Sequence, residues 1–112
     1  MTGLELERAF AAASAKRSEF LRSGEVRKGN KEYDRIHGIQ EQMRLLPDRG
    51  EGALKRLCQS EDLDLRLLAA ENLLSIDEAY AVARLVEMAA PGAGMKALEA
   101  KMTLKEWRKR DA

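Results

Sequence analysis

The sequence is poor in aromatic residues and in cysteine, and both shortages limit the sites that it can build. Aromatic side chains make up 4% of the 112 residues. A surface that stacks successive nucleic-acid bases needs several exposed aromatic rings, so this mode of binding is poorly provided for. Cys58 is the single cysteine, which excludes an intramolecular disulfide. Because it follows the apolar residues Leu54 and Leu57, we expect a buried thiol in a reducing, cytoplasmic compartment.

Long apolar runs are also missing. No segment approaches the roughly 20 apolar residues that a membrane-spanning helix needs. The N-terminus, Met1 to Glu5, contains an acidic residue and is not followed by the apolar stretch of a signal peptide. Strand-like alternation of apolar and polar residues does not compete with helical spacing. We therefore predict a protein that neither contacts a membrane nor contains a β-sheet.

The chain is rich in charged and helix-forming residues. Charged residues account for 35% of the chain and hydrophobic residues for 45%. Long stretches of Ala, Leu, Glu, Lys and Arg favour helix over strand. A chain of this length has room for one hydrophobic core. The predicted fold class is therefore all-α, with residues 1–112 forming a single domain.

Charge is balanced over the whole chain but unevenly distributed along it. The net charge of +1 divides into +2 over residues 1–47, −4 over residues 48–100 and +3 over residues 101–112. An acidic middle followed by a basic tail steers charged partners. Basic residues in a last helical turn also complement the helix dipole, which needs no partner at all.

Apolar spacing divides the chain into about six helices. Two longer helices are predicted over residues 4–22 and 25–46, with a candidate break at Gly29–Asn30 in the second. Four shorter ones follow at residues 50–59, 62–75, 77–90 and 94–110. Their short links force neighbours to pack antiparallel. We expect residues 1–47 to cap one end of two short helical hairpins formed by residues 48–112.

The segment Ser60 to Leu74 carries the most specific helical motif. Asp62 or Asp64 can accept hydrogen bonds from the first helical amides, and Arg66 can bond back to the turn. The pair Ala69–Ala70 lets a neighbouring helix approach closely. This order resembles the inner half of a HEAT repeat. The alternative is an ordinary capped helix, which has the same starting signals.

Two further segments extend this resemblance, Asn30 to Ile36 and Met102 to Lys109, which includes Trp107. Together they resemble a bacterial family of short, HEAT-like, all-helical proteins classed as a domain of unknown function, over about residues 5 to 110. The resemblance implies a stack of helix pairs and brings no catalytic residues with it. Small HEAT-like proteins are often encoded beside polymorphic toxins, which implies, by analogy, an immunity protein.

The face formed by Asp34, His37 and Glu41 is the one candidate for metal binding or acid–base chemistry. These residues are three and four positions apart on one predicted helix. A single histidine without a second imidazole makes a poor transition-metal site. Cys58 has no histidine partner in the sequence, and the serines lie outside any nucleophile motif. We predict no enzyme activity, no catalytic residue, no metal and no cofactor.

Binding to a partner protein is the predicted function. We expect inner-face residues of the second, fourth and sixth helices to contact the partner, namely Arg35, Glu71 and Glu99, with Asp34 and His37 as further candidates. The spacing of Tyr33 to Ile36 favours a place for Tyr33 in the core; the alternative is that the face it shares with Asn30 forms a polar contact with a partner. Trp107 is expected to seal the end of the core. The alternative for Trp107 is an exposed binding anchor.

The acidic middle and the basic tail predict different partners. The acidic middle favours a protein partner, such as a toxin with a basic active site that the protein would occlude. The basic tail favours the alternative, a nucleic-acid-binding accessory protein that uses Lys105, Arg108, Lys109 and Arg110. Because the acidic middle opposes a duplex, nucleic acid is the second choice.

Overall fold

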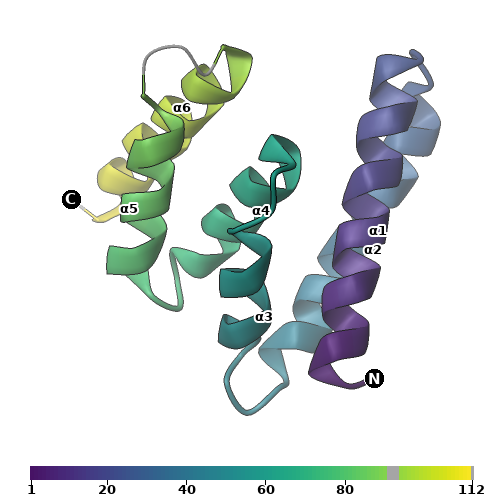
Figure 1. Ribbon diagram of the computed structural model, residues 1–112, viewed down its shortest axis with the longest axis horizontal. Coiled ribbons are helices and arrows are strands. Elements are labelled where there is room, and N and C mark those ends of the chain that lie inside the picture. Colours follow the sequence, from purple (N-terminus) through teal and green to yellow (C-terminus); the bar gives the residue numbers. More distant parts are fainter. Residues whose placement is uncertain (91–93, 112) are drawn as a thin grey trace.

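The structure, a computed structural model, describes residues 1–90 and 94–111, and the predicted link at Pro91 to Gly94 lies mostly outside them. Six helices follow one another (Figure 1): α1 (Gly3–Arg22), α2 (Val26–Arg44), α3 (Glu51–Leu57), α4 (Leu63–Leu73), α5 (Glu78–Met88) and α6 (Met95–Asp111). The described residues contain no strand. The all-α prediction is confirmed. No helix in this part of the chain has both the length and the apolar content to cross a lipid bilayer.

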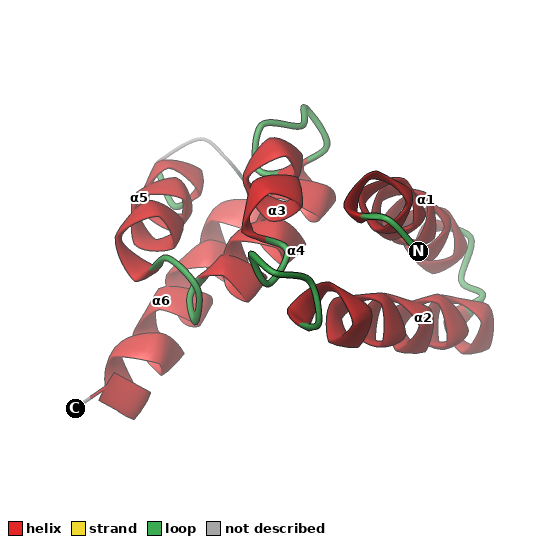
Figure 2. Ribbon diagram, turned by 90° about the horizontal axis from the view of Figure 1, so that it is seen from below, coloured by secondary structure: helices red, strands yellow, loops and turns green. Residues whose placement is uncertain are grey.

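Successive helices pair into three hairpins that lie side by side. The pairs are α1–α2, α3–α4 and α5–α6, and α4 in the middle contacts α1, α3, α5 and α6. Figure 2 shows the first helix of each hairpin along one side of the molecule and the second helix along the other. The molecule thus has two layers of helices, with α2, α4 and α6 in the same layer.

The core runs continuously through all three hairpins. Its largest fully buried side chains are Leu6, Phe10, Ile36, Met43, Leu73 and Leu85. Small residues sit where α4 meets its neighbours, because Ala69 and Ala70 are completely buried. Because these side chains are small, the helix axes can approach closely enough for the flanking leucines to interdigitate.

Helix α2 is continuous, so the predicted break at Gly29–Asn30 is wrong. Gly29 is buried, and a Cβ there would lie 3.0 Å from Cδ2 of Leu21 on α1. The glycine therefore serves the close crossing of α1 and α2 rather than a turn. Its cost to helix propensity, about 1 kcal/mol relative to alanine, is offset by this packing.

The predicted turn at Pro47 to Gly50 connects α2 to α3. It contains two residues with a left-handed backbone conformation. Arg49 has φ of 58° and Gly50 has φ of 82°. A Cβ on Gly50 would also approach Cβ of Met43 to 2.9 Å. Gly50 therefore meets two demands that no other residue type meets, a positive φ and a close approach to a core side chain.

Gly50→Ala is expected to lower the free energy of unfolding by about 2 kcal/mol, because it adds both backbone strain and a steric clash. The matched control is Gly38→Ala in the middle of α2, where a Cβ meets nothing within 4 Å. That change should raise the free energy of unfolding by about 0.5–1 kcal/mol. Urea denaturation of both variants measures the difference, and equal effects would contradict this account of the turn.

Candidate partner-binding groove

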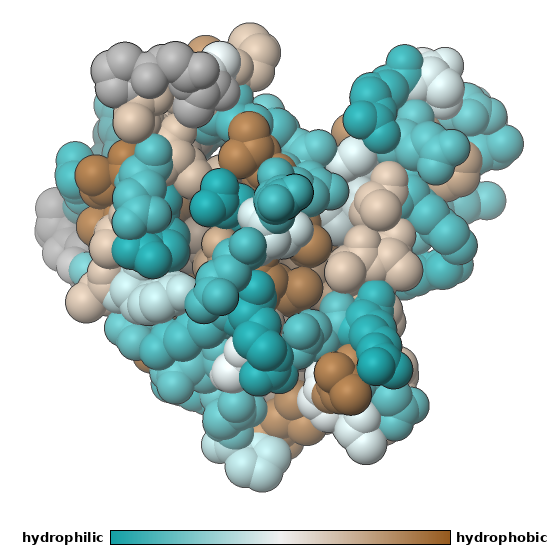
Figure 3. Space-filling view, in the orientation of Figure 1, coloured by the Kyte–Doolittle hydropathy of each residue, from teal (hydrophilic) through white to brown (hydrophobic). Residues whose placement is uncertain are grey.

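A groove opens between the α1–α2 hairpin and the helices α4 and α6. It consists of two adjoining hollows of about 520 and 550 Å³. Tyr33 and Glu71 line both hollows, so the two lie next to each other. The space-filling view shows a notch between the upper part of α1–α2 and the rest of the molecule (Figure 3). Leu67 and Leu68 of α4 also line the groove, although both are almost fully buried and belong to the core.

One wall of the groove is basic. The α1–α2 hairpin contributes Arg17, Arg22 and Arg44 and, among the described residues that line the groove, no carboxylate. The guanidinium of Arg17 lies over the ring of Tyr33, 4.9 Å from its centroid. This contact holds an exposed aromatic ring beside a fixed positive charge at the junction of the two hollows.

The opposite wall is mainly acidic. Helix α4 contributes Asp64 and Glu71, and α6 contributes Glu99 and Glu106. Lys96 and Arg110 on α6 partly balance these four carboxylates. The groove therefore presents opposite charges on its two sides, an arrangement that favours a partner carrying both signs.

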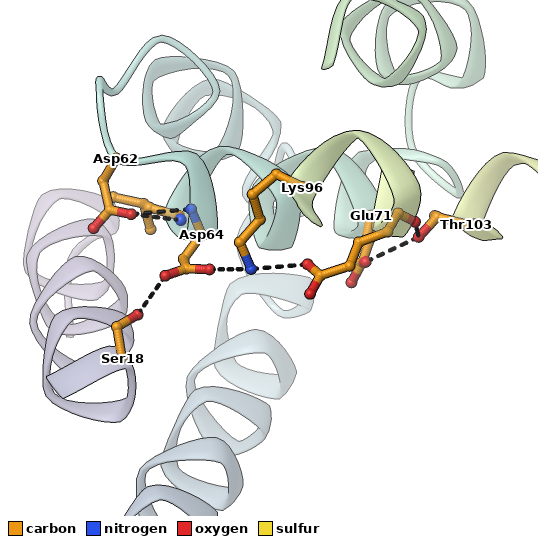
Figure 4. A network of polar contacts seen from close by, with 8 residues as sticks. Ser18, Asp62, Asp64, Glu71, Lys96 and Thr103 are labelled. Carbon is orange, nitrogen blue, oxygen red and sulfur yellow. Dashed lines mark hydrogen bonds and ion pairs between the residues drawn. The ribbon is translucent and has the colours of Figure 1, made fainter. Parts of the chain in front are cut away.

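A polar network anchors the acidic wall (Figure 4). Lys96 Nζ pairs with Asp64 and, at 2.8 Å, with Oε2 of Glu99. Ser18 of α1 donates a hydrogen bond to Oδ2 of Asp64 at 2.8 Å. Burial pushes the pKa of Asp64 upward, but the hydrogen bonds from Lys96 and Ser18 outweigh it and leave this pKa lowered. The network thus ties α1, α4 and α6 together through a charged carboxylate.

Glu71 is the least solvated carboxylate of the groove. Thr103 Oγ1 donates a hydrogen bond to Oε1 of Glu71 at 3.2 Å. Burial raises the pKa of Glu71 and the nearby Glu99 adds to the rise, while the Thr103 hydrogen bond opposes it. The net shift is upward, so the folded protein holds the Glu71 proton more tightly than the unfolded chain does.

The pKa shift of Glu71 makes stability depend on pH. A carboxyl whose pKa is higher in the folded state binds more protons there, so its contribution to stability falls as pH rises from its ordinary value of 4.5 through the raised value. Glu71→Gln removes this titration and keeps an acceptor for Thr103. The stability of Glu71→Gln relative to wild type should therefore increase between about pH 4 and 7. A difference that stays constant with pH, or shrinks, would refute this.

The structure brings two of the predicted contact residues into the groove. Glu71 and Glu99 line it, as described above. Arg35, Asp34 and His37 are exposed on α2 and are not among the lining residues. Arg35 pairs weakly with Glu32, with 3.8 Å between Nε and Oε2.

The face that carried the metal and acid–base candidates is open to solvent. Asp34, His37 and Glu41 are all exposed. His37 packs edge-on against Tyr33, with 4.5 Å between ring centroids. Among the described residues, no three His, Cys, Asp or Glu side chains converge in a way that could hold a metal ion.

The HEAT-like segment uses its polar residues for different tasks. Asp62 caps α4 by accepting hydrogen bonds from the amides of Asp64 and Leu65. Arg66 Nε donates to the carbonyl of Cys58 at 3.2 Å and so bonds back to the preceding turn. Asp64 does not cap the helix but belongs to the network of the acidic wall.

The two aromatic residues of the groove differ from each other in burial. Tyr33 is 40% exposed, so its predicted place in the core is wrong. Helical spacing put it on the apolar side of α2, but in the structure that position lines the groove and stays exposed. Trp107 is half-buried and packs against the core, and its Nε1 is buried without a hydrogen-bond partner among the described residues.

Sequence reasoning missed the basic wall. Arg17, Arg22 and Arg44 are scattered over two helices, and no local pattern distinguishes them from the other arginines. Only the packing of α1–α2 against the rest of the molecule brings them to one side of a hollow.

Comparison with known proteins supports the fold but assigns no activity. No family model matches the sequence, and no curated protein matches it. The crystal structure of the protein RPA1889 from Rhodopseudomonas palustris CGA009 is similar, with a TM-score of 0.90 and 20% identity, covering 97% of this chain and 90% of that one. At this identity the likeness concerns the fold alone. The chain is a small all-helical protein with a close structural neighbour.

Proposed function

We propose that this protein is a non-catalytic module that binds a segment of a partner protein in the groove. The observation that carries the proposal is the division of the groove into a basic wall on α1–α2 and a mainly acidic wall on α4 and α6. Complementary charges on both sides of a segment would fix its orientation and speed its encounter with the groove. The exposed ring of Tyr33 provides an apolar contact between the walls.

The charges of the two walls support a partner segment that carries both signs. A bound segment would turn basic side chains toward Glu99 and Glu106 and acidic ones toward Arg17 and Arg44. The basic part fits the proposed partner class, a toxin whose active site is basic and would be occluded by this contact. The three hairpins packed side by side support a HEAT-like stack, which by analogy supports an immunity role. Burial of the Cys58 thiol is in keeping with a cytoplasmic site of action.

Co-expression with the product of the adjacent gene tests this proposal. The readouts are cell growth and co-purification of the two proteins. Rescue of growth together with a stable complex supports an immunity function. A complex without any effect on growth supports protein binding but excludes the hypothesis that the partner is a toxin. A harmless neighbour that does not co-purify removes the proposed pairing.

A second candidate function rests on the outer side of α6. Lys101, Lys105, Arg108 and Lys109 surround a shallow hollow of about 480 Å³ over Leu104. Four basic side chains in one place suit contacts with phosphates. Filter binding of DNA and RNA over a salt series decides the matter, since binding through phosphates weakens steeply with added salt. No binding at low salt would eliminate this candidate.

A further inference from the structure

A smaller hollow lies where the end of α3, the start of α4, the end of α5 and the start of α6 meet. Its volume is about 160 Å³. Among the described residues, Lys96 is the one that lines both this hollow and the groove. This is many times the space that a single bound water molecule needs, so the hollow can hold a small ligand.

The hollow concentrates positive charge. Its described charged residues are Arg66, Arg84 and Lys96 against one carboxylate, Glu87. Arg84 Nη2 donates to Oε1 of Glu87 at 2.6 Å. Lys96 is already paired with two carboxylates of the groove, whereas Arg66 forms no ion pair with any described residue. The local excess of positive charge therefore comes mainly from the guanidinium of Arg66.

The guanidinium groups are held in place before any ligand arrives. Arg66 is anchored through Nε by the carbonyl of Cys58, which leaves its two terminal nitrogens as donors. Arg84 packs over the ring of Tyr80, 5.1 Å from the centroid. Fixed guanidinium forks match the paired oxygens of carboxylate and phosphate. The apolar side chains of Leu63 and Met88 line the same space and strengthen such contacts by excluding water.

We propose that this hollow, the anion pocket, binds a small oxyanion such as inorganic phosphate or a short carboxylate, a role separate from partner binding in the groove. Cys58 lines the pocket but does not react there, because burial raises the pKa of its thiol to about 11. A protonated thiol is a weak nucleophile, so the ligand is held and not modified.

Thermal unfolding in the presence of phosphate, acetate or chloride at equal pH and ionic strength tests the pocket. Phosphate or acetate should raise the Tm along a saturating curve, by about 4 °C or more at ten times the dissociation constant. The anion with the stronger effect identifies the class of ligand. A rise that is linear in concentration, as a general salt effect produces, or no rise beyond that of chloride, would overturn the proposal.

Matched variants locate the effect. Arg84→Gln should weaken binding of the effective anion at least tenfold in calorimetry, while Arg27→Gln, the same charge change at the exposed start of α2, should leave it unchanged. Glu87→Gln removes the pocket's carboxylate and should tighten binding, which keeps the test decisive if Arg84→Gln folds poorly. Equal affinities for wild type and Glu87→Gln, or equal losses in Arg84→Gln and Arg27→Gln, would reject the site.

Discussion

Replacing Phe10 with alanine is expected to lower the free energy of unfolding by about 3–5 kcal/mol. Phe10 is completely buried on α1 and belongs to the core cluster shared by the three hairpins. Truncation removes most of the ring's contacts and leaves a cavity that rigid helices on both sides cannot close. A small domain is stable by only about 5–15 kcal/mol, so the loss is a large part of the total.

Phe20→Ala provides the matched control on the same helix. Phe20 is only half-buried, and Lys28 Nζ lies over its ring at 5.7 Å from the centroid. Because less apolar surface leaves water there on folding, the loss should be about 1–2 kcal/mol. Urea denaturation monitored by circular dichroism measures both variants. Equal losses would show that α1 does not lie in the core as described.

Reversing charge on the acidic wall is expected to have the largest effect on partner binding. The double variant Glu99→Lys, Glu106→Lys should weaken the complex with the co-purified partner about 100-fold, since each change replaces an attraction with a repulsion. These positions suit the test better than Glu71, whose largely buried carboxylate accepts a hydrogen bond from Thr103. Isothermal titration calorimetry supplies the affinities.

The control for this experiment carries the same change in net charge elsewhere. Glu19 and Glu61 are exposed and do not line the groove, so Glu19→Lys, Glu61→Lys should bind almost as tightly as wild type. Melting curves confirm that each variant is folded, because Glu99→Lys also removes a partner of Lys96. Similar losses in both double variants would indicate long-range electrostatics and count against the groove as the binding surface.

The uneven charge along the chain only partly predicts how charge is arranged on the folded surface. Residues 48–100 carry net −4, yet Asp64, Glu71 and Glu99 from that segment face arginines of residues 1–47 across the groove. Charge summed along a sequence ignores which side of a helix each residue occupies. The charge of the proposed partner therefore follows better from the two walls than from the acidic middle alone.

The helices themselves were determined by the sequence alone. Every predicted helix is present and its ends agree to within two residues, because apolar spacing and capping residues act over a single turn. Asp62 and Asp77 cap α4 and α5 as their positions indicate. Even the crowding at Ala69–Ala70 is visible in the sequence, since small residues in an apolar helix have few other uses.

Only the tertiary structure decided what those helices build together. The groove exists because the α1–α2 hairpin diverges from α4 and α6, and its walls combine residues as distant as Arg17 and Arg110. The same divergence leaves Tyr33 exposed although its helical position is apolar. The anion pocket likewise brings together Arg66 of α4 and Arg84 of α5. Local hydrogen bonds and spacing specify each helix, whereas the faces that meet depend on side-chain packing between hairpins, which no local pattern encodes.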